Sequence, residues 1–164
     1  MRPFTVESFR ERCRDTDPAA VERLARAAGV FNESEIAIAC ELVEENLARG
    51  ADASGYHFLF ADGAEGIEGY TCFGPIPATA ARWELYWIAV DPRVGRAGLG
   101  RHLQAASEAA VRKMGGALMI AETSTLPRYE PARRFYLAQG YALLAEIPDW
   151  HDEGDGLAIF GKRL

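Results

Sequence analysis

The sequence is poor in the residues that build disulfide frameworks and metal centres. It has three cysteines and three histidines in 164 residues, widely spaced and with no CxxC pair. Disulfide-rich domains and zinc modules need such residues at close, regular spacing. We therefore expect reduced, buried thiols and no metal site.

An excess of positive charge and long apolar runs are also missing. The net charge is −6, whereas non-specific nucleic-acid binding and attraction to anionic membranes need a basic surface. No apolar run approaches the roughly 20 residues that cross a bilayer. Residues 1–5 lack the apolar core of a signal peptide. These absences predict a cytoplasmic protein that binds neither nucleic acid nor membranes.

The pattern of apolar residues predicts one α+β domain over residues 1–164, a length that suits a single domain. The predicted element order is β-α-α-β-β-β-α-β-α-β-β. Helix signals include Asp17 with Pro18, and a capping box formed by Asn32 and Glu35. The expected strands cover residues 4–14 (a weak pattern), 56–61, 67–73, 82–90, 117–122, 141–147 and 156–162. The expected helices lie between residues 17 and 29, 32 and 50, 98 and 114, and 128 and 139.

A glycine-rich turn, Gly95-Arg96-Ala97-Gly98-Leu99-Gly100-Arg101, follows the strongest strand. The first N–H groups of a helix have no internal partner and bind phosphate well. Arg96 and Arg101 can add charge-assisted hydrogen bonds. The alternative is a surface turn that only caps a helix. Its position at the carboxyl end of an apolar strand, where open α/β sheets bind ligands, favours a phosphate site.

Two common phosphate motifs do not fit this turn. A P-loop needs Gly-Lys-Ser/Thr, which is absent. A dinucleotide fingerprint needs a small residue where Leu103 stands, and it follows the first strand of its domain, whereas here about 90 residues come before it.

The sequence resembles the GCN5-related N-acetyltransferase (GNAT) superfamily over nearly its whole length. The turn matches the family pattern Q/R-x-x-G-x-G/A except at Gly95, and residues 132–141 match A-x-x-x-Y-x-x-x-G-F/Y. The resemblance implies a mixed, mostly antiparallel twisted sheet flanked by helices. It also implies transfer of an acetyl group from acetyl-CoA to a primary amine of a small molecule or peptide.

The resemblance further implies where acetyl-CoA binds. In this family the turn holds the CoA pyrophosphate through backbone N–H groups, and a bulged strand frees an N–H that polarises the thioester carbonyl. Tyr129 stands where the family often has Asn. The expected cofactor-binding residues are Ile88, Ala89, Val90, Gly95, Arg96, Ala97, Gly98, Leu99, Gly100, Arg101, Tyr129 and Arg133.

Two residues are candidates for proton transfer. Glu84 lies in an aromatic strand whose apolar walls raise a carboxyl pKa toward neutrality, which suits a general base. By alternation it shares a face with Tyr86, Ile88 and Val90. Tyr136 is the candidate acid, which the resemblance places beside the thioester sulfur. The alternatives are a Glu84–Arg82 ion pair and a Tyr136 that only fills the core.

The acceptor amine is expected at an acidic loop of residues 148–155, where Asp149 and Trp150 could bind a cation, together with Glu122. Residues 30–34 would form the opposite wall. A solvated hairpin loop is the alternative. The second hypothesis for function is a non-catalytic acyl-CoA-binding sensor, which would not need Glu84 and Tyr136. The sequence is compatible with a homodimer and leaves the acceptor open.

Overall fold

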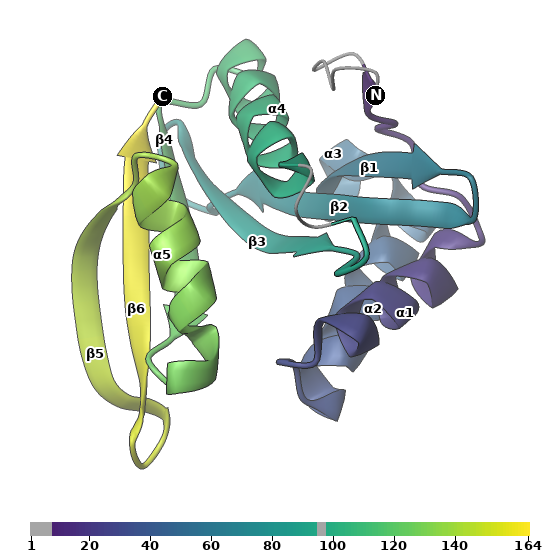
Figure 1. Ribbon diagram of the computed structural model, residues 1–164. Helices are drawn as coiled ribbons and strands as arrows, with labels where there is room; N and C mark the ends of the chain where they lie inside the picture. The colour runs from purple at the N-terminus through teal and green to yellow at the C-terminus, as the bar shows by residue number, and fades with distance from the viewer. Residues whose placement is uncertain (1–7, 95–97) are drawn as a thin grey trace.

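The computed structural model describes residues 8–94 and 98–164, and shows one continuous six-stranded sheet with helices on both faces (Figure 1). The helices are α1 (Asp17–Ala28), α2 (Glu33–Arg49), α3 (Ala51–Ser54), α4 (Leu99–Lys113), the 3₁₀ helix η3 (Pro127–Tyr129) and α5 (Glu130–Ala138). The strands are β1 (His57–Gly63), β2 (Gly66–Pro75), β3 (Arg82–Val90), β4 (Leu118–Ser124), β5 (Ala142–Asp152) and β6 (Asp155–Arg163).

The sheet has the strand order β1-β2-β3-β4-β6-β5. The pairing of β3 with β4 is parallel, and every other pairing between these strands is antiparallel. This confirms the predicted α+β class with a mixed, mostly antiparallel sheet. Among the described residues, no helix is long and apolar enough to cross a bilayer.

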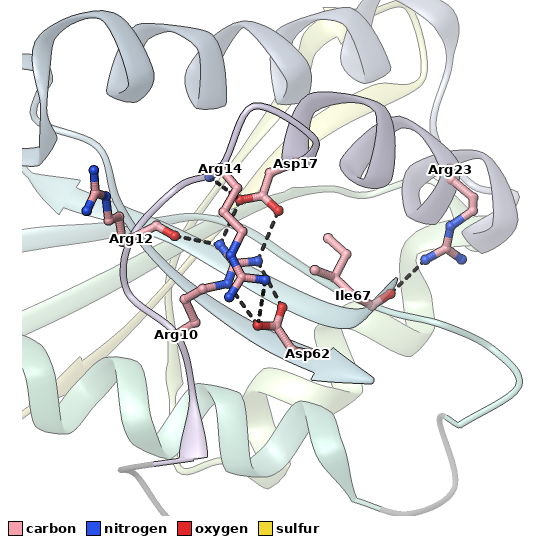
Figure 2. A network of polar contacts seen from close by, with 7 residues as sticks. All are labelled: Arg10, Arg12, Arg14, Asp17, Arg23, Asp62 and Ile67. Atoms are coloured by element: carbon pink, nitrogen blue, oxygen red, sulfur yellow. Dashed lines mark hydrogen bonds and ion pairs between the residues drawn. The ribbon is translucent and has the colours of Figure 1, made fainter. Parts of the chain in front are cut away.

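The weak first strand predicted over residues 4–14 is wrong for its described part. Residues 8–14 contribute one isolated bridge, between Arg10 and Phe60. The Arg10 guanidinium donates to Asp17 at 2.8 Å and to Asp62 at 2.9 Å, and the backbone N–H of Arg14 also donates to Asp17 (Figure 2). These hydrogen bonds to the buried Asp17 carboxylate direct the chain into α1, so residues 8–14 do not continue along the sheet as a strand.

The first two helices begin and end at residues that suit helix termini. The predicted capping box is confirmed, since Asn32 accepts from the Glu35 N–H and Glu35 accepts from the Asn32 N–H. The N-cap of α1 is Thr16 and not Asp17, because the Asp17 side chain is bound to Arg10 and Arg14.

Two apolar cores lie on opposite faces of the sheet. One packs β-strand residues such as Leu85 and Phe160 against Leu99 and Leu103 of α4 and Tyr136 of α5. The other packs Phe60 and Tyr70 against Val21, Leu24 and Val43 of α1 and α2. The sheet therefore has an α4–α5 face and an α1–α2 face.

A β-bulge at Tyr86 changes the direction of the side chains along β3. Leu85 pairs with Phe73 and Trp87 with Cys72, so Tyr86 has no opposite residue on β2. Leu85 packs in the α4–α5 core before the bulge, and Ile88 and Val90 pack against that core after it. The expectation that Glu84 shares a face with Ile88 and Val90 is therefore wrong, since a bulge reverses the alternation.

The last hairpin also differs from the prediction. β5 continues to Asp152, and only Glu153 and Gly154 connect it to β6. Residues 148–152, predicted as a loop, are mostly extended strand. Ile147 and Asp152 pair with Leu157 and Asp155 of β6 on either side of this segment, and the register shift between them coincides with the positive φ of Asp149 (52°). Pairing at both ends therefore keeps the segment in the hairpin.

Candidate active site

A cavity of about 500 Å³ lies where β3 and β4 separate. The two strands pair only as far as Leu85 and Ala121, and beyond this point they diverge. The cavity is lined from five directions: by the α1–α2 connection, the end of β3, the end of β4, η3 with α5, and the β5–β6 hairpin. The residues that line the cavity include Val30, Phe31, Glu35, Tyr86, Trp87, Ile88, Val90, Glu122, Arg128, Tyr129, Tyr136, His151 and Asp155.

The free edge of β3 supplies backbone hydrogen-bond groups to this cavity. The Asp91 N–H donates to Glu68 at 2.7 Å, toward β2. Since successive residues of a strand direct their N–H groups to opposite sides, the Ala89 N–H points to β2, and those of Ile88 and Val90 point to the opening. Of the three residues expected to polarise the thioester carbonyl, Ile88 and Val90 direct their backbone N–H groups to the opening, and Ala89 does not.

Glu84 is half-buried on β3, two residues before the bulge at Tyr86. Burial and the nearby charge of Glu122 raise its pKa to about 7. It has no hydrogen bond or ion pair to any residue that the structure describes, and Arg82 donates to the carbonyls of Ala80 and Ala81. The alternative Glu84–Arg82 pair is therefore not formed. Glu84 is not among the residues that line the cavity, whereas Tyr86, two residues further along β3, is.

Tyr136 lines the cavity from α5 and is 6% exposed. Its ring packs against Phe135, Tyr141 and Phe160. Burial raises the pKa of Tyr136 well above its ordinary value, so the hydroxyl is protonated at neutral pH. The hydroxyl makes no hydrogen bond within residues 8–94 and 98–164, although a buried Tyr O–H usually finds a partner. It is therefore available to a ligand.

The predicted phosphate turn leads into α4. Gly98 has a φ of +77° and is the N-cap, so α4 begins at Leu99 and presents its unpaired N–H groups there. Leu99 itself is buried, so only its backbone can meet a ligand. A Cβ on Gly100 would lie 3.6 Å from Phe135 and from Val90, which is ordinary van der Waals contact, so alanine would also fit at this position. Three expected cofactor residues, Gly95, Arg96 and Ala97, lie outside the described residues.

Arg133 and Tyr129, two other expected cofactor residues, have protein partners. The Arg133 guanidinium donates to the carbonyls of Ser124 and Leu126, at 2.7 and 3.0 Å. The Tyr129 hydroxyl donates to Glu35 at 2.9 Å and lies 3.2 Å from the carbonyl oxygen of Val30. Tyr129 still lines the cavity, but its hydroxyl joins η3 to α2.

The expected acceptor residues lie at different places. Glu122 lines the cavity from the end of β4. Asp149 accepts from the Gly154 N–H at 2.7 Å, and Trp150 is 60% exposed; neither is among the residues lining the cavity. The hairpin contributes His151 and Asp155 in their place. No sequence signal distinguishes these neighbours, since strand register decides which of them faces the cavity.

The α1–α2 connection, with the start of α2, lines the cavity, as expected for residues 30–34, through Val30, Phe31, Asn32 and Ser34. Phe31 lies 4.9 Å from Trp87 and 6.4 Å from Tyr129 between ring centroids. Glu35 was recognised only as a capping residue. Within the described residues, no group of three or more His, Cys, Asp or Glu side chains could hold a metal ion.

Comparison with known proteins agrees with this architecture. A family model described as an acetyltransferase (GNAT) domain matches residues 54–143. A search of curated proteins finds no match. A Desulfovibrio desulfuricans protein assigned to the GNAT family of acetyltransferases is 41% identical, with a TM-score of 0.91 over 94% of this chain and 97% of that chain.

Two more distant structures share the fold. An aminoglycoside 6′-N-acetyltransferase in complex with coenzyme A is 17% identical, with a TM-score of 0.72 over 94% of this chain and 96% of that chain. The ribosomal-protein-S18-alanine N-acetyltransferase from Escherichia coli is 18% identical, with a TM-score of 0.71 over 94% and 92%. On the family match and the 41% identical relative, this chain belongs to the GNAT family of acetyltransferases.

Proposed function

We propose that this protein is an N-acetyltransferase that moves the acetyl group of acetyl-CoA to a primary amine of a small molecule or peptide by direct attack. The observation that carries the proposal is the pair Glu84 and Tyr136. Glu84, with a pKa of about 7, lies one position before the last β3–β4 pair, and Tyr136, whose hydroxyl has no partner among the described residues, lines the cavity from the opposite face of the sheet. A non-catalytic acyl-CoA sensor needs neither group.

The donor would lie along the free edge of β3. The first N–H groups of α4, at Leu99 and Gly100, suit the pyrophosphate, with Arg101 near Gly98 to add charge. The N–H groups of Ile88 or Val90 suit the thioester carbonyl oxygen, where a donor of this kind contributes about 3 kcal/mol to transition-state stabilisation.

The chemistry balances with two proton transfers. The neutral amine nitrogen attacks the carbonyl carbon, a C–N bond forms, and the C–S bond breaks with its electron pair going to sulfur. Glu84, directly or through water, takes the proton that nitrogen loses. Tyr136 donates its proton to the thiolate and regains one from water, while Glu84 releases its proton to water. The products are an amide and CoA with a free thiol.

The test is thiol release from acetyl-CoA with a panel of primary amines, using Glu84→Gln, Tyr136→Phe and the wild type. The proposal expects turnover to fall by about a hundredfold or more in each variant, with little change in the Kd for acetyl-CoA. Wild-type turnover in both variants would contradict these roles. Tight acetyl-CoA binding without thiol release from any amine would favour the sensor.

A further inference from the structure

The carboxylates around the cavity differ in whether they already have partners. Glu35 accepts hydrogen bonds from Tyr129 and from the Asn32 N–H. The Ser124 hydroxyl donates to Asp155. Glu84 and Glu122 have no hydrogen bond or ion pair to any described residue. Two carboxylates at this site are therefore unpaired.

These two carboxylates lie on the same face of adjacent strands. Glu84 pairs with Ile120 across the parallel β3–β4 ladder, and Glu122 is two residues further along β4. Leu85 and Ala121 alternate with them and pack in the α4–α5 core. Glu84 and Glu122 consequently both point to the α1–α2 face, where the charge of Glu122 helps to raise the pKa of Glu84.

The described lining of the cavity carries an excess of negative charge. Glu35, Glu122 and Asp155 are acidic and Arg128 is basic, and histidine is left out of the formal charge. The lining therefore has a formal charge of −2, to which Glu84 adds when it ionises. The aromatic rings of Phe31, Tyr86 and Trp87 stand on the same side, and their faces attract cations.

A second observation points to a ligand in this cavity. Tyr136 is 94% buried by its 6% exposure, lines the same cavity, and has an unpaired hydroxyl in the part of the chain that the structure describes. The hydroxyl oxygen is not among the fully buried unpaired atoms, so it opens into the cavity, where a ligand or water can bond it. The exposed Glu122 therefore borders a cavity that already offers a ligand a buried ring with an accessible hydroxyl.

We propose that the acceptor carries a second positive charge besides the amine that is acetylated, and that Glu122 binds this second cation. The attacking amine must be neutral when it attacks, so it cannot neutralise the site at that moment. A persistent second cation would balance Glu122, leaving Glu84 to accept the proton. Acceptors of this class include diamines, polyamines and amino-acid amides with a basic side chain. This inference rests on the proposed function.

The test uses conjugates in which the sulfur of CoA is joined through –CH₂–CO–NH– to a short alkyl chain. The CoA part binds the donor site and the alkyl chain stands in for the acceptor, so the natural acceptor need not be known. Three conjugates of equal length end in an ammonium, a methyl or a carboxylate group. Calorimetry gives their Kd values and that of CoA for the wild type, Glu122→Gln and Glu146→Gln. Glu146 is a matched control, because it is exposed on β5 and does not line the cavity.

The ammonium conjugate should bind about tenfold more tightly than the methyl conjugate, the scale of a hydrogen bond between charged groups. The carboxylate conjugate should bind most weakly. Glu122→Gln should remove most of the ammonium preference and leave the Kd of CoA unchanged, and Glu146→Gln should change neither. Added salt should reduce the preference.

Equal or tighter binding of the methyl conjugate would overturn the proposal, as would an ammonium preference that persists in Glu122→Gln. Neither of these two outcomes would contradict the proposed acetyltransferase function. If no conjugate binds more tightly than CoA itself, the cavity does not hold the acceptor, and the proposed function would then be contradicted along with this inference.

Discussion

The hydroxyl of Tyr129 donates a hydrogen bond to the carboxylate of Glu35, 94 residues earlier in the chain, at 2.9 Å. This bond joins η3, beside the proposed donor site, to the start of α2, which lines the cavity on the side proposed for the acceptor. Phe31 lies between the Tyr129 and Trp87 rings. The bond therefore fixes the width of the cavity on its acceptor side.

Tyr129→Phe should raise the KM for the amine several-fold and leave the Kd for acetyl-CoA nearly unchanged, because the ring remains while the link to α2 is lost. The free energy of unfolding should fall by about 1 kcal/mol, the usual net worth of one hydrogen bond. Steady-state kinetics measure the KM for the amine, and urea unfolding measures the free energy of unfolding. Glu33→Gln is the control, since Glu33 is exposed and pairs with Arg26 on the outside. Identical kinetics in Tyr129→Phe and the wild type would refute the positioning role.

The pH dependence of turnover should show the ionisation of Glu84. A general base acts as the carboxylate, so kcat/KM should rise with pH through about 7, the pKa to which burial and Glu122 raise this group. Glu122→Gln removes a negative neighbour, so the midpoint should move to lower pH. The wild type and Glu122→Gln are measured with the same amine, so the ionisation of the amine contributes equally to both pH profiles and does not affect the difference between their midpoints. An unmoved midpoint would show that the rise belongs to another group.

Stability should depend on Glu84 in the same window. Its folded pKa of about 7 exceeds the ordinary value of 4.5, so the folded state binds more protons than the unfolded state between these values. The free energy of unfolding therefore falls as pH rises from 4.5 to 7. Glu84→Gln should have a higher Tm than the wild type at pH 8 and a similar Tm near pH 4. Thermal unfolding at both pH values tests this, and equal Tm values at pH 8 would contradict it.

Two neighbouring tyrosines should respond in opposite ways to loss of the hydroxyl. Tyr136→Phe should lower kcat about a hundredfold with little effect on Tm, because its hydroxyl has no partner in the described structure. Tyr141→Phe should lower stability by about 1–2 kcal/mol and leave kcat nearly unchanged, because Gln104, which is 1% exposed, donates to that hydroxyl at 2.5 Å. Rate and Tm measured on both variants separate a catalytic hydroxyl from a structural one.

Asp91 should control donor binding although it does not line the cavity. It is 3% exposed, accepts from the Arg93 N–H at 3.0 Å and side chain at 2.8 Å, and pairs with Arg23 of α1 at 3.1 Å. These bonds hold the chain as it leaves β3. Asp91→Ala should weaken CoA binding by about tenfold, the scale of one lost charge-assisted hydrogen bond.

The matched control is Asp62→Ala, because Asp62 is also paired with two arginines, Arg10 and Arg14, but lies on β1 (Figure 2). Calorimetry with CoA compares the two variants. A Kd in Asp91→Ala equal to that in Asp62→Ala would mean that the Asp91 bonds serve stability alone.

Local signals predicted much of the fold. The capping box of Asn32 and Glu35, and the strand over residues 82–90, appear in the structure as expected. The capping box depends on residues three apart, and the strand is signalled by its own run of apolar and aromatic residues. The start of α1 and the extent of β5 were misjudged, because Arg10 and the pairing with β6 override the local pattern.

The sequence by itself determined the family, through the Gly98–Gly100 spacing and the segment containing Tyr136, and it selected Glu84 from its apolar neighbours. These are properties of residue type and spacing. Tertiary structure alone decided that a bulge at Tyr86 separates the face of Glu84 from that of Ile88, and that Tyr129 binds Glu35. It also decided that His151, not Trp150, lines the cavity. Each of these depends on the register and packing of distant segments, which short-range patterns do not encode.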